Sequence, residues 1–370
     1  MRIAILTLPL HTNYGGILQA YALQTILQRM GHEVQVIDKR WRLYPWRWYN
    51  RVLFYAKQFA KIILRKKFLV DWRHPSCYPK ISSQVQPFVD TYIHIRKIQS
   101  WTDIHEGDYD AIVVGSDQIW RPMYVKYSMA SSIEDVFLKF TQNWQVRRIA
   151  YAASFGVDRW EYTEEETANC RHLLQAFYFV SCRELSGVEL CGQYLDKKSE
   201  LVLDPTILLS VADYNCLCNN IPKQEGVLFA YIIDANAQTD EFVRAISKRL
   251  GKKIRRANAR VEDASAPIVE RIQPPIENWI SGIRDASVVI TDSYHACVFA
   301  MLYNKPFLVL KNVNRGVGRV YSVLELFGQA NRYVNDYDVS KKMQFCYEQP
   351  NVDFTEWRLN SMCFIKQALQ

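Results

Sequence analysis

The chain has 370 residues, of which 49% are hydrophobic and 23% charged, so its composition excludes a disordered protein and its length predicts two domains of roughly 150–200 residues each. Its nine cysteines are dispersed, which excludes a disulfide framework and favours a reducing compartment. The sequence has no run of roughly 18–20 uncharged apolar residues and no export signal after its first apolar run, so we expect a cytoplasmic protein.

The chain begins with the pattern of a Rossmann-like domain. An apolar run at residues 2–9 predicts a buried strand, and a glycine turn at residues 13–16 follows it. Apolar side chains at helical spacing predict a helix over residues 17–30, which Gly31 ends, and residues 33–38 predict a second strand. Strand, turn, helix and strand in this order open a Rossmann-like fold.

Residues 39–73 form a basic and aromatic segment. It contains eleven lysines and arginines against one acid, Asp71, and it has ten aromatic residues. Residues 52–68 have the spacing of a helix with one apolar and one basic face, so we expect this insertion to dock on an anionic membrane surface. The alternatives are a helix packed on the first domain with its basic face in solvent, or a face that binds an acidic glycan. No nucleic-acid motif accompanies the segment, so we expect no nucleic-acid partner.

Strands and helices alternate along the rest of the chain. Further strands of the first domain are expected at residues 111–114, 148–154, 178–182 and 201–203, and the Asp204-Pro205 pair closes that domain. The second domain is predicted to contain strands at 226–233, 253–257, 286–292 and 307–310, with helices at 240–250, 276–284 and 295–303. We therefore expect an α/β protein with two Rossmann-like domains facing a cleft, at residues 1–204 and 205–345. Residues 346–370 contain a helix, at 355–369, that we expect to cross back to the first domain.

Several candidate site residues follow predicted strands of the first domain. Asn13, Tyr14, Gly15 and Gly16 stand where the first strand meets the first helix, a place where a backbone approaches a ligand and a helix N-terminus favours an anion. The alternative for these residues is a plain tight turn.

The next two strand ends carry charged residues. Ser116 and Asp117 follow the strand at 111–114, where Asp117 is placed either for acid–base chemistry or to cap the next helix. Arg183 follows the strand at 178–182, where it either binds a carboxylate or phosphate through two hydrogen bonds or forms a structural pair with Glu184.

The second domain supplies a histidine at the same kind of position. Asp292, Ser293, Tyr294 and His295 close the strand at 286–292 and open the following helix, a placement that suits anion binding and proton transfer. Arg319 adds a cation beyond a neighbouring strand end. The sequence has no metal-ligand motif, so we expect no metal.

An ordered set of motifs resembles the polysaccharide pyruvyl transferase family. The matching stretches are NYGGILQAYALQ (13–24), VVGSDQIW (113–120), YAASFG (151–156), SCRE (181–184), LVLDPTILL (201–209), TDSYHACVFAMLYNKPF (291–307) and the arginine at 319. They run over about 300 residues and both predicted domains.

The resemblance implies a fold like the two-domain GT-B type glycosyltransferases. It implies phosphoenolpyruvate as the donor, no cofactor, and a sugar diol of a bacterial surface polysaccharide such as capsule as the acceptor. It also implies that Arg183 and His295 hold the donor, helped by Ser293 and Tyr294. Some members have a basic residue where this chain has Ser293, which leaves more of the phosphate binding to Arg319.

Further expectations follow from this resemblance and from the chemistry of phosphoenolpyruvate. The acid and base are expected among His295, Asp117 and Asp292. The donor is expected to bind on the second domain. The acceptor, a lipid-linked glycan, is expected to bind on the first domain, at residues 13–16 and Ser116. The enzyme would then work peripherally at the inner face of the cytoplasmic membrane. The competing functions are a GT-B glycosyltransferase that uses a nucleotide sugar and a non-enzymatic glycan-binding relative.

Overall fold

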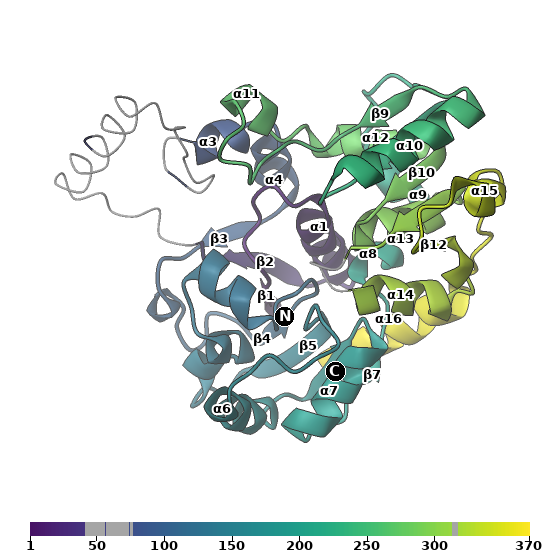
Figure 1. The fold of residues 1–370 in the computed structure, drawn as a ribbon. Helices are drawn as coiled ribbons and strands as arrows, with labels where there is room; N and C mark the ends of the chain where they lie inside the picture. Colours follow the sequence, from purple (N-terminus) through teal and green to yellow (C-terminus); the bar gives the residue numbers. More distant parts are fainter. Residues whose placement is uncertain (41–55, 57–73, 75–76, 313–316) are drawn as a thin grey trace.

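The computed structural model describes residues 1–40, 56, 74, 77–312 and 317–370 (Figure 1). The predicted membrane helix at 52–68 therefore lies outside the described residues, apart from Ala56. Two parallel sheets, one from each half of the chain, lie side by side with helices around both (Figure 1). This arrangement confirms the predicted α/β fold with two Rossmann-like halves.

The first sheet has seven strands in the order β3-β2-β1-β4-β5-β6-β7. Its strands are β1 (Arg2–Leu6), β2 (Glu33–Asp38), β3 (Ile95–Lys97), β4 (Ala111–Val114), β5 (Arg147–Ala153), β6 (Phe179–Cys182) and β7 (Glu200–Leu201). All neighbouring strands are parallel, and β1 and β4 are almost wholly buried, as strands covered on both faces must be. The main helices around this sheet are α1 (Tyr14–Arg29), α4 (Gln86–Tyr92), α6 (Glu164–Leu174) and α7 (Leu185–Leu195).

The second sheet has five parallel strands in the order β12-β11-β10-β8-β9. Its strands are β8 (Val227–Tyr231), β9 (Ile254–Arg256), β10 (Ala286–Thr291), β11 (Phe307–Leu310) and β12 (Tyr333–Val334). The main helices of this half are α10 (Ala237–Leu250), α12 (Ile276–Asp285), α13 (Tyr294–Leu302) and α14 (Val317–Leu326).

Helix α1 begins earlier than the sequence pattern predicted. Its first residue is Tyr14, so Gly15 and Gly16 lie in its first turn and do not form a turn before it. Asn13 has the extended backbone of an N-cap, with φ −85° and ψ 105°. The prediction was wrong because glycine is uncommon inside helices, yet it adopts helical backbone angles without steric cost.

The two halves are joined through the start of α1. The Tyr14 hydroxyl donates a 2.6 Å hydrogen bond to the carbonyl oxygen of Pro274 and lies 2.9 Å from that of Ala257. Its ring lies 5.8 Å from the ring of Tyr231 and 5.7 Å from that of Trp279. One hydrophobic cluster accordingly contains core residues of both halves.

The last helix, α16 (Thr355–Leu369), packs against the first half. Arg147 on β5 donates a 3.0 Å hydrogen bond to the carbonyl oxygen of Ala368, and the backbone N–H of Leu203 donates one of 2.9 Å to the Ser361 hydroxyl. The rings of Tyr151 and Phe364 lie 6.1 Å apart.

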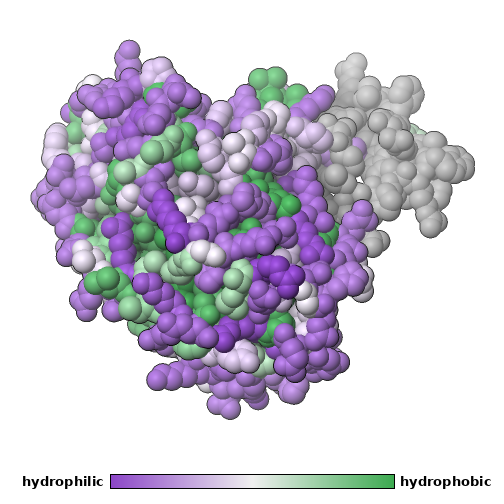
Figure 2. Space-filling view, turned by 180° about the vertical axis from the view of Figure 1, so that it is seen from behind, coloured by the Kyte–Doolittle hydropathy of each residue, from purple (hydrophilic) through white to green (hydrophobic). Residues whose placement is uncertain are grey.

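One face of the molecule is mostly hydrophilic in its described residues. Seen from behind, it shows scattered small hydrophobic patches between polar side chains (Figure 2). Within the described ranges, no helix has both the length and the apolar character needed to cross a membrane. Two cations of the basic segment are used internally: Lys39 donates to the carbonyl oxygen of Met129 at 2.6 Å, and Arg40 pairs with Asp38 at 2.7 Å.

Candidate functional site

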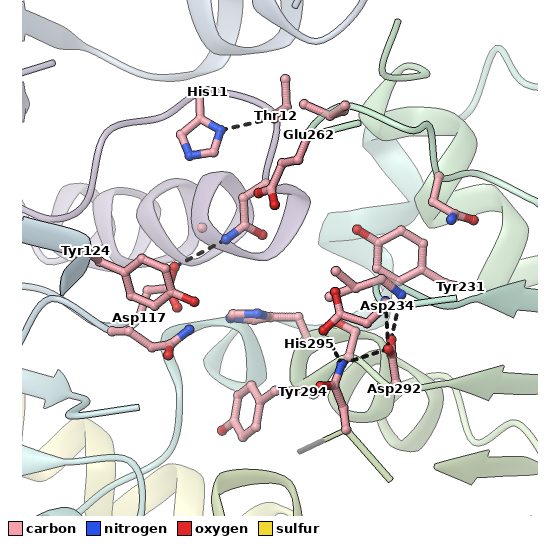
Figure 3. A pocket seen from close by; sticks show the side chains of 18 of the residues that line it. His11, Thr12, Asp117, Tyr124, Tyr231, Asp234, Glu262, Asp292, Tyr294 and His295 are labelled. Atoms are coloured by element: carbon pink, nitrogen blue, oxygen red, sulfur yellow. Dashed lines mark hydrogen bonds between the residues drawn. The ribbon is translucent and has the colours of Figure 1, made fainter. Parts of the chain in front are cut away.

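A cavity of about 640 Å³ opens where the strand orders of the two sheets reverse. The reversals fall between β1 and β4 and between β8 and β10, and ligands of open α/β sheets bind beyond the carboxyl ends of strands at such points. The cavity is within the roughly 300–1,000 Å³ of typical small-molecule sites. Residues that follow these strands line it (Figure 3), among them His11, Thr12, Asn13, Asp117, Asp234, Asp292, Ser293, Tyr294 and His295, with Arg319 added from α14.

His295 borders the cavity from the second half but contacts residues of the first. It lies in the first turn of α13, whose N-cap Ser293 accepts a long hydrogen bond of 3.5 Å from Ala296. Its Nε2 atom is 3.4 Å from Nη1 of Arg183 and 3.6 Å from Oδ2 of Asp204. The histidine ring therefore lies at the junction of the two halves, as Figure 3 shows at the centre of the site.

Gly15 is the reason why the imidazole fits there. A Cβ atom at residue 15 would lie 2.0 Å from Nδ1 of His295 and 2.3 Å from its Cγ, far inside van der Waals contact. The glycine thus gives room to a side chain of the other half, whereas the sequence predicted that it lets the backbone approach a ligand. Gly16 and Asn13 do line the cavity, and Tyr14 instead joins the two halves.

Arg183 lies beneath the cavity wall and does not border the cavity itself. Its side chain is fully buried among carboxylates: Asp204 at 2.7 Å, Asp117 at 3.3 Å and Glu184 at 3.6 Å. Its guanidinium also stacks over the Tyr294 ring at 4.5 Å. Burial alone would lower the pKa of Arg183, but Asp204, Tyr294 and Asp117 raise it. Of the two sequence alternatives, the pair with Glu184 is present and is joined by two further acids, whereas donor binding by Arg183 stays a prediction.

Asp204 is a site residue that the sequence analysis missed. Its Oδ2 accepts hydrogen bonds from Arg183 at 2.7 Å and from the Ser116 hydroxyl at 2.8 Å. Its Oδ1 accepts from the backbone N–H of Thr206 at 3.0 Å and from its hydroxyl at 2.7 Å. Burial would raise the pKa of Asp204, but His295, Arg183 and Thr206 hold it well below its usual value.

The signal for Asp204 was present in the sequence, since it directly follows the predicted strand at 201–203 and lies in the LVLDPTILL stretch. The sequence analysis used Asp204 only to end the first domain, because it precedes a proline. Ser116, predicted for an acceptor or anion-binding loop, is buried and binds Asp204 instead of lining the cavity.

Asp117 borders the cavity in a strained conformation. Its φ is +61°, a region that few non-glycine residues adopt and that clusters at functional sites. It does not cap a helix, because the next one, α5 (Pro122–Tyr124), begins five residues later. One carboxylate oxygen faces Arg183, and the other lies 3.4 Å from Nδ2 of Asn13 on the cavity side. Asp117 is therefore placed to act on a ligand.

Asp292 also borders the cavity, but its oxygens are occupied. It accepts hydrogen bonds from the backbone N–H groups of Ile233 and Asp234, at 2.7 and 3.0 Å, and from the side chain of Asn312 at 2.8 Å. Burial raises its pKa despite these bonds. Asp292 thus holds together the loops after β8, β10 and β11, which makes Asp117 the better candidate of the two for acid–base chemistry.

Arg319 brings a positive charge to the cavity. It lies in the first turn of α14 and is 6% exposed. Burial and repulsion by Arg183 lower its pKa to about 10, with Glu184 and Asp117 acting in the opposite direction. The guanidinium therefore stays protonated at neutral pH and can attract an anionic ligand.

His11 borders the cavity and is another residue that the sequence analysis passed over. Its Nδ1 lies 3.0 Å from the hydroxyl of Thr12. Burial and the charge of Arg40 lower its pKa to about 4, against the effect of Asp117. His11 is therefore neutral at neutral pH and suits hydrogen bonding to uncharged ligand groups. The sequence could have predicted this residue, because His11 follows the first predicted strand.

Comparison with known proteins gives a family and a fold. The model of the polysaccharide pyruvyl transferase family matches residues 13–314. Two similar solved structures are UDP-GlcNAc 2-epimerases. One is from Neisseria meningitidis, bound to UDP-GlcNAc, with a TM-score of 0.51 and 10% sequence identity. The other is from Methanocaldococcus jannaschii, with UDP-GlcNAc and UDP, with a TM-score of 0.52 and 10% sequence identity. Each comparison covers 100% of this chain and 99% of the other.

A third similar structure is S. aureus MnaA with UDP, at a TM-score of 0.52 and 12% identity, covering 100% of this chain and 96% of that one. At these identities the likeness concerns the fold alone, which is of the two-domain GT-B type. No curated protein sequence matches the chain.

Proposed function

This chain belongs to the polysaccharide pyruvyl transferase family, and we propose that it transfers the pyruvyl group of phosphoenolpyruvate onto two hydroxyls of a glycan sugar. The product is a cyclic pyruvate ketal of a bacterial surface polysaccharide, and inorganic phosphate is released. The main support is that His295 and Arg319 border one cavity, with Arg183 and Asp204 directly behind the histidine.

The donor is an anion, and two features of the cavity lining suit an anion. Arg319 supplies a full positive charge there. The N-terminus of the 16-residue helix α1 borders the same cavity, because Asn13 and Gly16 line it. Helix N-termini carry a partial positive charge and free N–H groups that bind phosphate and carboxylate.

The proposed reaction requires one proton at carbon. His295 gives a proton to the methylene carbon of phosphoenolpyruvate, which becomes a methyl group and leaves the adjacent carbon electrophilic. Asp117 borders the same cavity, and its carboxylate would stabilise the positive charge that develops. The first sugar hydroxyl attacks that carbon and returns a proton to His295.

The second step closes the ring. The bond between the ketal carbon and the phosphate oxygen breaks, phosphate leaves, and the second sugar hydroxyl attacks and loses its proton to phosphate. Tyr124 and Tyr127 line the cavity from the first half, and aromatic rings of this kind can pack against the apolar side of a sugar. This placement supports an acceptor on the first half, as the sequence analysis expected.

The test is incubation with labelled phosphoenolpyruvate and a bacterial lipid extract, followed by a search for acid-labile label in glycolipid. A parallel reaction with UDP-sugars separates the proposal from nucleotide-sugar transfer. Label from phosphoenolpyruvate in the glycolipid supports the proposal. Transfer from the UDP-sugar alone, or glycan binding without any transfer, would contradict it.

We also propose a peripheral position at the inner face of the cytoplasmic membrane, beside a lipid-linked acceptor. Its support is the composition of residues 39–73, which attract anionic lipid by about 1 kcal/mol per basic residue near the surface. The described Lys39 and Arg40 are bound internally, so the attraction must come from the later cations. The test is sedimentation with anionic and neutral liposomes, with glutamate at positions 57, 61, 65 and 66 as the control. No binding of the wild type to anionic liposomes at low salt would exclude this role.

A further inference from the structure

The two ring nitrogens of His295 lie in different surroundings. Nε2 faces the buried first-half residues, 3.6 Å from Oδ2 of Asp204 and 3.4 Å from Nη1 of Arg183. Nδ1 lies on the side of Gly15, in the first turn of α1. A neutral imidazole carries its proton on one nitrogen only, so these surroundings decide which nitrogen is free.

Asp204 favours a proton on Nε2. It is fully buried, and both of its oxygens are held by Arg183, Ser116 and Thr206. The hydrogen bonds and the nearby cations hold its pKa well below the usual value, so it is a carboxylate with a fixed position. At 3.6 Å its negative charge attracts a proton on Nε2 without a hydrogen bond, and a carboxylate so placed favours one tautomer of the ring.

The N-terminus of α1 acts in the same direction. Its partial positive charge opposes a proton on Nδ1 and favours a bare nitrogen there. Arg183 is the opposing group, since its N–H could donate to a bare Nε2. Its Nη1 is, however, 0.7 Å closer to Asp204 (2.7 Å) than to His295 (3.4 Å). Further charged residues border the same cavity as the ring, among them Asp117, Asp234, Asp292 and Arg319.

We propose that Asp204 is a positioning residue that keeps a proton on Nε2 of His295, so that Nδ1 is the atom that exchanges protons with a ligand. In the reaction, Nδ1 gains a proton to form the imidazolium and gives it to the methylene carbon. The other proton remains on Nε2, which faces Asp204, throughout. The tautomer is inferred without reference to the reaction, whereas its catalytic consequence rests on the proposed function.

The first test measures the tautomer directly by NMR of protein labelled with ¹⁵N in histidine. The chain has seven histidines, and His295→Gln identifies the resonances of the one in question. We expect a protonated Nε2 and a bare Nδ1 in the wild type at alkaline pH. Asp204→Asn should move the proton partly or wholly to Nδ1. A wild-type proton on Nδ1, or an unchanged tautomer in Asp204→Asn, would overturn the proposal.

The second test is kinetic. Asp204→Asn should lower kcat by roughly 10²–10⁴-fold, the usual contribution of acid–base catalysis, while the KM for phosphoenolpyruvate changes less than about twofold because Asp204 does not border the cavity. The pH profile of kcat should shift as well, which a merely structural role would not cause. Asp213→Asn is the matched control, because Asp213 pairs with Arg29 away from the cavity. A changed KM with an unchanged kcat would refute the role.

A third variant covers the case in which Asp204→Asn does not fold. Ser116→Ala removes one hydrogen bond to Asp204 but leaves its charge, so the proton should stay on Nε2 with a smaller loss of kcat. A proton on Nδ1 in this variant would contradict the proposal. If the wild type consumes no phosphoenolpyruvate, the proposed function fails, and the NMR result still decides the tautomer.

Discussion

Replacing Gly15 with alanine tests the contact between α1 and the histidine of the other half. The new Cβ would lie 2.0, 2.3 and 2.7 Å from Nδ1, Cγ and Cε1 of His295. Real contacts start near 3.4 Å, so the ring or the helix must move by roughly 1 Å or more. The ring cannot simply retreat, because Arg183 and Asp204 lie 3.4 and 3.6 Å behind it.

We therefore expect two effects of Gly15→Ala. Overpacking typically costs about 1–3 kcal/mol, which outweighs the ~1 kcal/mol by which alanine favours a helix over glycine. A displaced His295 should also lose much of a general acid's ~10²–10⁴-fold contribution to kcat. Urea unfolding measures the first effect, and phosphate release from phosphoenolpyruvate measures the second.

The matched variants decide whether His295 is the cause. In a His295→Ala background the clash is gone, so adding Gly15→Ala should cost no stability. The effects of the two substitutions on the free energy of unfolding should therefore be strongly non-additive in a double-mutant cycle. Gly16→Ala should cost less, because its nearest neighbours, the side-chain ends of Asp117 and Asn13, are 3.2 and 3.3 Å away. A stable, fully active Gly15→Ala protein, or additive effects in the cycle, would refute the reasoning.

Four further changes test other parts of the structure. His295→Ala should lower transfer by about 10²–10⁴-fold without lowering Tm; a normal rate of phosphate release would remove the residue from the mechanism. Arg183→Met removes the cation that three buried acids share and should cost about 3–5 kcal/mol in urea unfolding, whereas unchanged stability with a raised donor KM would place Arg183 on the donor. Tyr14→Phe loses a buried hydrogen-bond donor and should cost about 1–3 kcal/mol with an unchanged KM; equal stability would mean that the bond contributes nothing. Because the folded pKa of Asp204 is depressed, its stabilisation is present above its unfolded pKa of about 3.9 and is lost as the pH falls below it. The stability difference between the wild type and Asp204→Asn should therefore narrow from pH 7 to pH 3, and a constant difference would contradict this.

Local patterns in the sequence predicted the strands and helices of both halves well. Buried parallel strands are apolar throughout, and the helices between them have a clear period, so β11 was predicted at its observed bounds, residues 307–310. The strands β3 and β12 were missed because three and two residues carry no periodicity. The start of α1 was misplaced because its first turn contains two glycines.

The candidate site was predicted in part, from rules about strand ends and not from the periodicity of apolar residues. Rules about strand ends selected Asp117 and His295, because such rules depend only on the local order of elements. They could not show that Gly15 accommodates His295, 280 positions later, or that Arg183 is surrounded by acids and lies behind the cavity wall. Such pairings depend on how the two halves pack together, and the spacing of residues within one half carries no information about that.

The bond between Tyr14 and the second half has a consequence for the protein during its synthesis. The carbonyl groups that the hydroxyl reaches belong to Ala257 and Pro274, 243 and 260 positions later. At a translation rate of about 5–20 residues per second, the first turn of α1 waits roughly 12–50 s for its partners. Through this interval the Tyr14 ring and the apolar start of the helix lack the partners that cover them in the folded protein. The nascent chain should therefore depend on chaperones for longer than its N-terminal sheet alone would require.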